Sequence, residues 1–93
     1  MMPPLTLSEL RGRLEAIDAE CIALLARRVE VARAVGAHKR AHGLATLDAG
    51  REARVVARAA HLGREAGLEE EEVRGIYWQV VAMSRRAQQG EAS

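Results

Sequence analysis

The sequence predicts an all-α fold of three helices per chain, the first of them much the longest. Three observations lead to this class. The commonest residues are Ala, Leu, Val, Arg and Glu, and Phe is absent. Most of these common residues favour helices. Apolar residues recur in steps of three and four, the helical spacing, and nowhere in the alternation typical of strands. Glycines and polar cap residues divide the chain into three blocks.

The first helix is predicted from about Ser8 to His42, since this stretch contains no proline. Thr6 or Ser8 is suited to cap its N-terminus, and Gly43 is a plausible stop. Its apolar residues alternate between steps of three and four, which forms a heptad seam. The seam consists of Leu7, Leu10, Leu14, Ile17, Cys21, Leu24, Val31 and Val35.

Two shorter helices follow. Asp48 is a suitable N-cap for a helix from about Ala49 to Ala66, and Gly67 then reads as its C-terminal cap. The acidic run Glu69–Glu72 places negative charge in the first turn of the third helix, where the helix dipole favours it. That helix is expected to reach about Gln89, and the residues beyond it are expected to fray.

Length, charge and cysteine content narrow the class of protein. The 93 residues fit one domain, residues 1–93, ordered from about 7 to 89 with short flexible ends. A net charge of +1 predicts no general attraction to nucleic acid or to an anionic membrane. One cysteine excludes an intrachain disulfide and a cysteine metal cluster. Neither a secretory pattern nor a membrane-length apolar run is present, so we expect a soluble, cytoplasmic protein.

The length of the first helix predicts a homodimer. At 1.5 Å per residue, about 35 residues make a rod of roughly 50 Å, whereas a compact domain of this size has a radius of gyration of about 12 Å. Two helices of half that length cannot cover the whole seam, so a second chain is expected to cover the rest. The alternative is an extended monomer with an exposed apolar strip, which is rare in soluble proteins.

Two cations interrupt the apolar face of the first helix. Arg28 fills the heptad position between Leu24 and Val31, and Lys39 lies one turn past Val35. Eleven residues at about 100° each bring Lys39 within roughly 20° of the direction of Arg28. Burying a charge without compensation costs several kcal/mol, so both cations need an anion. Either a structural carboxylate or a bound substrate can supply it.

The other helices also place polar groups in apolar stripes. Ser84 and Gln88 continue the stripe of Tyr77, Val80 and Val81, and Glu52 shares a face with Val55, Ala59 and Leu62, beside Arg51. Each has a simpler explanation. Arg28 can fix register, Lys39 can extend to solvent, Ser84 can bond its own backbone, Gln88 can be an exposed terminal residue, and Arg51 and Glu52 can form a surface pair. Taken together, these groups predict a cationic pocket suited to a small dianion.

Taken in order along the chain, these residues resemble a known family, the all-α chorismate mutases. The resemblance runs from about Leu7 to Gln88 and rests on an ordered set of short motifs. These are Leu10-Arg11, Ile17-Asp18, Leu24-Leu25-Ala26-Arg27-Arg28, Val35-Gly36, Lys39, Asp48-Ala49-Gly50-Arg51-Glu52, Ser84 and Gln88. No single motif is distinctive, but the set with these spacings is specific.

The resemblance implies an intertwined homodimer with two active sites, and an enzyme that converts chorismate to prephenate for phenylalanine and tyrosine biosynthesis without a metal or cofactor. It also implies that Arg11 reaches the active site of the partner subunit. Geometry supports a shared site, because Arg11 and Arg28 are 17 positions apart, or about 25 Å along one helix. The two side chains cannot both touch one small ligand from the same chain.

The resemblance further implies a role for each candidate residue. Arg28 and the Arg11 of the other chain would bind the two substrate carboxylates, with help from Ser84. Lys39 and Gln88 would donate to the ether oxygen, which gains negative charge as its bond breaks. Glu52, with backbone near Asp48, would accept from the ring hydroxyl, and Arg51 would complete the cationic wall. Val35, Val55 and Val81 would line the pocket and exclude water.

Other functions stay open. An isochorismate pyruvate lyase has the same fold and a similar set of cations, although the Arg51-Glu52 pair and Ser84 favour the mutase. A non-catalytic helical dimer, such as a regulatory module, would explain the seam but not the polar residues. The enzyme could also act in a complex with another shikimate-pathway enzyme.

Overall fold

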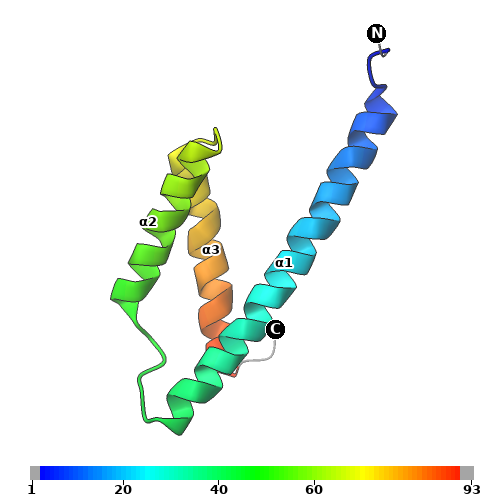
Figure 1. The fold of residues 1–93 in the computed structure, drawn as a ribbon. Coiled ribbons are helices and arrows are strands. Elements are labelled where there is room, and N and C mark those ends of the chain that lie inside the picture. Colours follow the sequence, from blue (N-terminus) through cyan, green and yellow to red (C-terminus); the bar gives the residue numbers. More distant parts are fainter. Residues whose placement is uncertain (1–2, 91–93) are drawn as a thin grey trace.

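The chain folds into three α-helices and, within residues 3–90 that the computed structural model describes, no strands (Figure 1). The helices are α1 (Leu7–Ala41), α2 (Ala49–Glu65) and α3 (Glu70–Gln88). The predicted fold class is confirmed, and each predicted helix boundary lies within one residue of the observed one. The predicted fraying of the C-terminus concerns mainly residues 91–93, which lie outside the described residues.

The helix ends are set by local hydrogen bonds that the sequence anticipates. The Thr6 hydroxyl accepts from the backbone N–H of Glu9 at 3.1 Å, which caps α1. The α2 helix ends in a Schellman motif, in which Leu68 N–H bonds the Gly63 carbonyl at 2.8 Å. Gly67 adopts the positive φ of 84° that this motif requires.

The α3 helix holds the fold together, because it packs against both of the others whereas α1 and α2 do not pack on each other. Gly63 of α2 lets Val73 of α3 approach, and Gly36 of α1 lies directly against the backbone of Gln88. The buried core consists of small side chains, which allow close helix packing. Its apolar members are Ala32, Val56, Ala59, Ala60, Val73, Val81 and Ala87.

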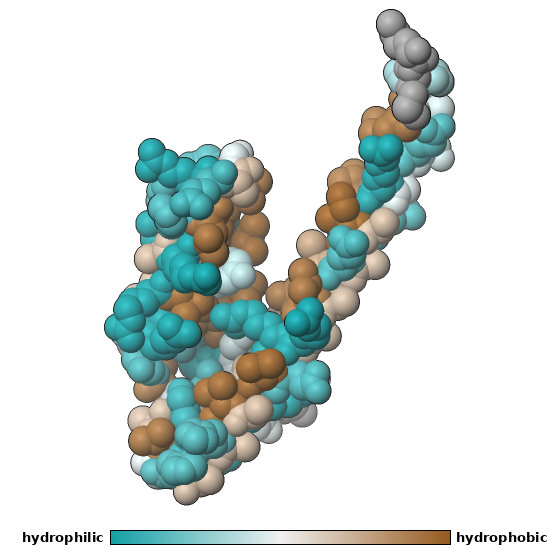
Figure 2. Space-filling view, viewed as in Figure 1, coloured by the Kyte–Doolittle hydropathy of each residue, from teal (hydrophilic) through white to brown (hydrophobic). Residues whose placement is uncertain are grey.

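The N-terminal half of α1 extends away from the other two helices, so the molecule is elongated (Figure 1). Its radius of gyration is 17.1 Å, against about 12 Å for a compact chain of this length. Apolar side chains recur along this free half (Figure 2), among them Leu14 at 60% and Ile17 at 52% exposure. Cys21, a member of the predicted seam, is also exposed in the single chain. No helix among the described residues is long and apolar enough to cross a membrane.

Candidate functional site

A pocket of about 400 Å³ opens where the C-terminal half of α1, the start of α2 and the end of α3 meet. This volume is in the range of small-molecule sites. Apolar side chains from all three helices form part of the wall. The lining residues are Arg28, Val31, Ala32, Val35, Lys39, Asp48, Arg51, Glu52, Val55, Val81, Ser84 and Gln88.

Seven of the eight polar residues that the sequence singles out line this one pocket. They are Arg28 and Lys39 on α1, Asp48, Arg51 and Glu52 at the start of α2, and Ser84 and Gln88 on α3. The eighth, Arg11, lies on the free half of α1 and is exposed. Residues separated by up to 60 positions therefore meet at one place, and Arg11 of the same chain does not join them.

Lys39 links the first helix to the loop and to the third helix. Its Nζ donates to the Thr46 carbonyl at 2.9 Å and to Gln88 Oε1 at 2.8 Å. The side chain is therefore folded inward, and the alternative in which it extends to solvent does not hold. An ammonium carries three donors, so one N–H is still available to a ligand in the pocket.

Arg28 is held from one side by the third helix. Its Nη1 donates to Ser84 Oγ, and its guanidinium lies 5.9 Å from the centre of the Tyr77 ring. Ser84 is the buried polar residue of this face, at 7% exposure. Its hydroxyl therefore accepts a hydrogen bond from Arg28. Because a guanidinium has five donors, Arg28 retains enough for a bidentate contact with a carboxylate.

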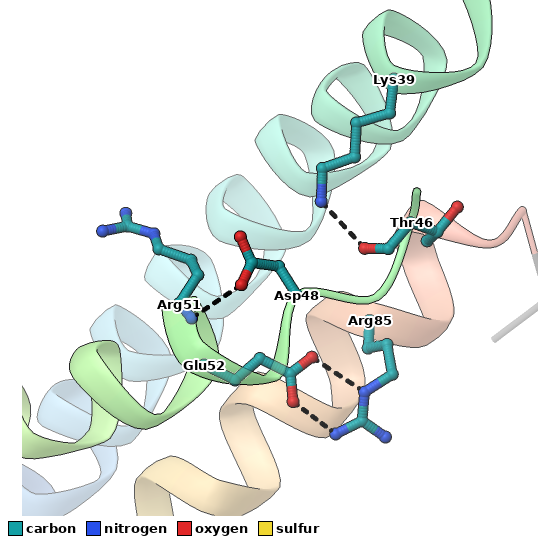
Figure 3. A network of polar contacts seen from close by, with 6 residues as sticks. All are labelled: Lys39, Thr46, Asp48, Arg51, Glu52 and Arg85. Carbon is teal, nitrogen blue, oxygen red and sulfur yellow. Dashed lines mark hydrogen bonds and ion pairs between the residues drawn. The ribbon is translucent and has the colours of Figure 1, made fainter. Parts of the chain in front are cut away.

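Glu52 is paired with a residue that the sequence interpretation missed. Arg85 of α3 donates from Nε to Glu52 Oε2 at 2.9 Å and from Nη2 to Oε1 at 2.8 Å (Figure 3). The alternative of a surface pair between Arg51 and Glu52 does not hold, because Glu52 pairs with Arg85. Arg51 instead donates its backbone N–H to Asp48 Oδ1 at 3.0 Å, which confirms Asp48 as the cap of α2.

The Glu52–Arg85 pair shifts the pKa of both groups. The hydrogen bonds from Arg85 lower the pKa of Glu52 below its ordinary value, against the opposing effect of burial. Coulombic attraction from Arg85 and Lys39 lowers this pKa further. The same hydrogen bonds raise the pKa of Arg85. Glu52 is therefore an ionised hydrogen-bond acceptor at neutral pH.

The charges of the pocket favour an anion. The pocket is lined by three cations, Arg28, Lys39 and Arg51, and by two carboxylates, Asp48 and Glu52. One of these carboxylates is already neutralised by Arg85, which does not line the pocket. The wall thus has an excess of positive charge beside apolar surface, where charge interactions are stronger than in water. Within residues 3–90, no cluster of three or more His, Cys, Asp or Glu residues is placed to hold a metal ion.

The chain is similar to known proteins in sequence and in fold. Over 54 residues it is 41% identical to proteins named intracellular chorismate mutase from Mycobacterium tuberculosis and Mycobacterium bovis, a match that covers 58% of this chain. The same match covers 51% of those relatives, so the chain spans about half the length of the curated relatives it matches.

A solved structure gives broader coverage. The fold matches that of a conserved hypothetical protein from Pyrococcus furiosus with a TM-score of 0.73 and 31% sequence identity. That match covers 92% of this chain and 99% of the other. Residues 10–89 match the family described as chorismate mutase type II. This match includes every element of the pocket, and the chain therefore belongs to the chorismate mutase type II family.

Proposed function

We propose that this chain is a chorismate mutase, which rearranges chorismate to prephenate in the biosynthesis of phenylalanine and tyrosine. The observation that carries the proposal is the pocket, in which seven polar residues from three helices surround a space of about 400 Å³. Family membership supports the choice of substrate. Chorismate is a small dianion, which suits a wall with more cations than carboxylates.

The proposed reaction is pericyclic: a carbon–oxygen bond breaks while a carbon–carbon bond forms in the same molecule. Catalysis then depends on holding a reactive conformer and on stabilising the charge that develops on the ether oxygen. Lys39 has one unused N–H for this oxygen. Gln88 accepts from Lys39 through Oε1, which leaves its amide N–H groups as donors.

Substrate carboxylates are proposed to bind Arg28 and Arg11 of a second copy of the chain. Arg28 would provide a bidentate contact, because its planar guanidinium matches a carboxylate, and Ser84 would hold it in place. Glu52 would accept from the ring hydroxyl, beside the backbone of Asp48, and Arg51 would add positive charge to the wall.

A homodimer completes the proposal. The exposed apolar stripe on the free half of α1 gives the dimer a driving force, since burying apolar surface is favourable. Arg11 lies on that same half of α1, so a partner helix would bring it to a site that it cannot reach within its own chain. We also propose a cytoplasmic location, which is supported by the word "intracellular" in the names of the relatives.

Incubation of the purified protein with chorismate, and separately with isochorismate, tests the proposal. Formation of prephenate from chorismate is expected. Pyruvate and salicylate from isochorismate would identify a lyase instead, and no consumption of either compound would identify a non-catalytic helical protein. Lys39→Ala, purified in the same way and assayed at the same concentration, is the control for a contaminating mutase. Its activity should be lower than that of the wild type, whereas a contaminant would give equal activity in both samples.

A further inference from the structure

Arg85 holds Glu52 from outside the pocket. Both carboxylate oxygens are bound, at 2.8 and 2.9 Å, by two nitrogens of one guanidinium. Glu52 comes from the start of α2 and Arg85 from the end of α3, and the two side chains point toward each other (Figure 3). Glu52 lines the pocket and Arg85 does not. Arg85 therefore approaches the carboxylate from the side away from a ligand.

This pair still leaves Glu52 able to accept a further hydrogen bond. Each oxygen of an ionised carboxylate has about two lone-pair positions, and Arg85 occupies one on each oxygen. The fork geometry also fixes the plane of the carboxylate, because both bonds run parallel. The lone pairs of Glu52 that Arg85 does not use are consequently held in a fixed orientation.

The Glu52–Arg85 pair also leaves the pocket cations Lys39 and Arg51 free to bind a ligand, because Glu52 already has a partner. Lys39 is close enough for its charge to lower the pKa of Glu52, and Arg51 lines the same pocket. A Glu52 side chain without Arg85 has several rotatable bonds and two pocket cations as competing partners. An internal ion pair with Lys39 would occupy the N–H that the proposed reaction needs.

We propose that Arg85 is a positioning residue, which fixes Glu52 as the acceptor for the substrate hydroxyl and keeps this carboxylate from pairing with Lys39. This inference rests on the proposed function. Its physical basis is a guanidinium fork, and a lysine in its place would keep the charge but lose the bidentate geometry.

Kinetics of Arg85→Gln and Arg85→Lys test the inference, with Arg86→Gln as a matched control. Arg86 is the neighbouring arginine on the same turn and is exposed. We expect Arg85→Gln to lower kcat/KM about 10- to 100-fold, the effect of misplacing a substrate contact. Arg85→Lys should recover part of this loss, and Arg86→Gln should match the wild type.

Two further readouts distinguish positioning from a merely structural link between α2 and α3. In Arg85→Gln the acid limb of the pH profile should move to higher pH, because the bonds that lower the pKa of Glu52 are gone. In a Glu52→Gln background, Arg85→Gln should have little additional effect, since Arg85 acts through Glu52. Carboxyl titration by ¹³C NMR measures the same pKa without any turnover.

The inference is overturned if wild-type protein converts chorismate while Arg85→Gln keeps its kcat/KM and acid limb. It is also overturned if Arg85→Gln loses activity only in step with its thermal midpoint, with the acid limb unmoved. A wild-type protein that does not convert chorismate would instead refute the proposed function, and the inference with it.

Discussion

Lys39 donates a hydrogen bond of 2.8 Å to the side-chain oxygen of Gln88, across 49 positions of sequence. This bond fixes the orientation of the Gln88 amide, because the oxygen must face the ammonium and the NH₂ group must face away from it. One contact thereby prepares two donors: the last N–H of Lys39 and the amide of Gln88.

Lys39→Ala should reduce turnover of chorismate by about 10²- to 10³-fold, the typical effect of removing a donor aimed at developing charge. Folding should change much less, because Lys39 is only partly buried. Steady-state kinetics and thermal unfolding measure the two effects separately. Arg33→Ala removes an exposed cation from the same helix and serves as the control. Near-normal kinetics in Lys39→Ala would contradict its proposed role.

Gln88→Glu should make activity depend on pH. A glutamine amide donates at every pH, so wild-type activity should stay broad across neutral pH. A carboxyl at this position donates only when protonated, so the variant should be active in acid and lose turnover as the pH rises. The measurement is kcat/KM between pH 4 and 9 in both proteins. A wild type that loses turnover steeply across neutral pH would count against Gln88 as the donor.

Gly36→Ala should displace the end of α3. An added Cβ would lie 2.7 Å from the Cα of Gln88 and would also meet its carbonyl oxygen, and backbone cannot move aside as a flexible side chain can. Overpacking of this kind costs about 1–3 kcal/mol, and it would also shift Gln88 relative to Lys39. Both the thermal midpoint and kcat should fall.

Gly12→Ala is the matched control for this substitution. The position lies in the same helix, and an added Cβ there would meet nothing within 4 Å. Helix propensity alone predicts a gain of about 1 kcal/mol. Equal effects of the two substitutions would show that α1 and α3 do not approach closely at Gly36.

Acid should destabilise the protein partly through Glu52. Its pKa is lowered in the folded state, so the stability that the pair contributes is fully present above the ordinary glutamate pKa. That contribution is lost as the pH falls through the lowered pKa. The thermal midpoint should therefore drop more between pH 7 and pH 3 in wild type than in Glu52→Gln. Glu30→Gln, at an exposed position, should show the same drop as the wild type. Equal drops of the thermal midpoint in all three proteins would show that Glu52 does not contribute to the acid sensitivity.

The helices were predictable because their signals are local. Thr6, Asp48 and Gly67 set helix ends through bonds to residues three or four positions away, and such bonds depend on spacing alone. The polar interruptions of apolar stripes were equally visible, as Arg28 and Lys39 illustrate. All of these residues could be recognised without knowledge of how the helices pack.

The partners of the polar residues depend on packing and were not predictable. Arg85 was missed because the alignment of α2 against α3 cannot be inferred from the sequence of either helix alone. A carboxylate such as Glu52 on a packed face needs a cation, but the sequence does not show which one lies opposite. The Thr46 carbonyl as acceptor for Lys39 depends likewise on the path of the loop. Leu62, expected on the packed face of α2, is 45% exposed because that face centres on Val56 and Ala60 instead.

The central claim is that one active site is made by two chains, and complementation between two inactive variants tests it most directly. Arg11→Ala and Arg28→Ala should each be nearly inactive. When equal amounts of the two are unfolded and refolded together, about half of the dimers are mixed, and each mixed dimer has one site with both arginines intact. The mixture should therefore regain about a quarter of wild-type activity. A mixture as inactive as its components, or an Arg11→Ala variant with full activity, would contradict the account.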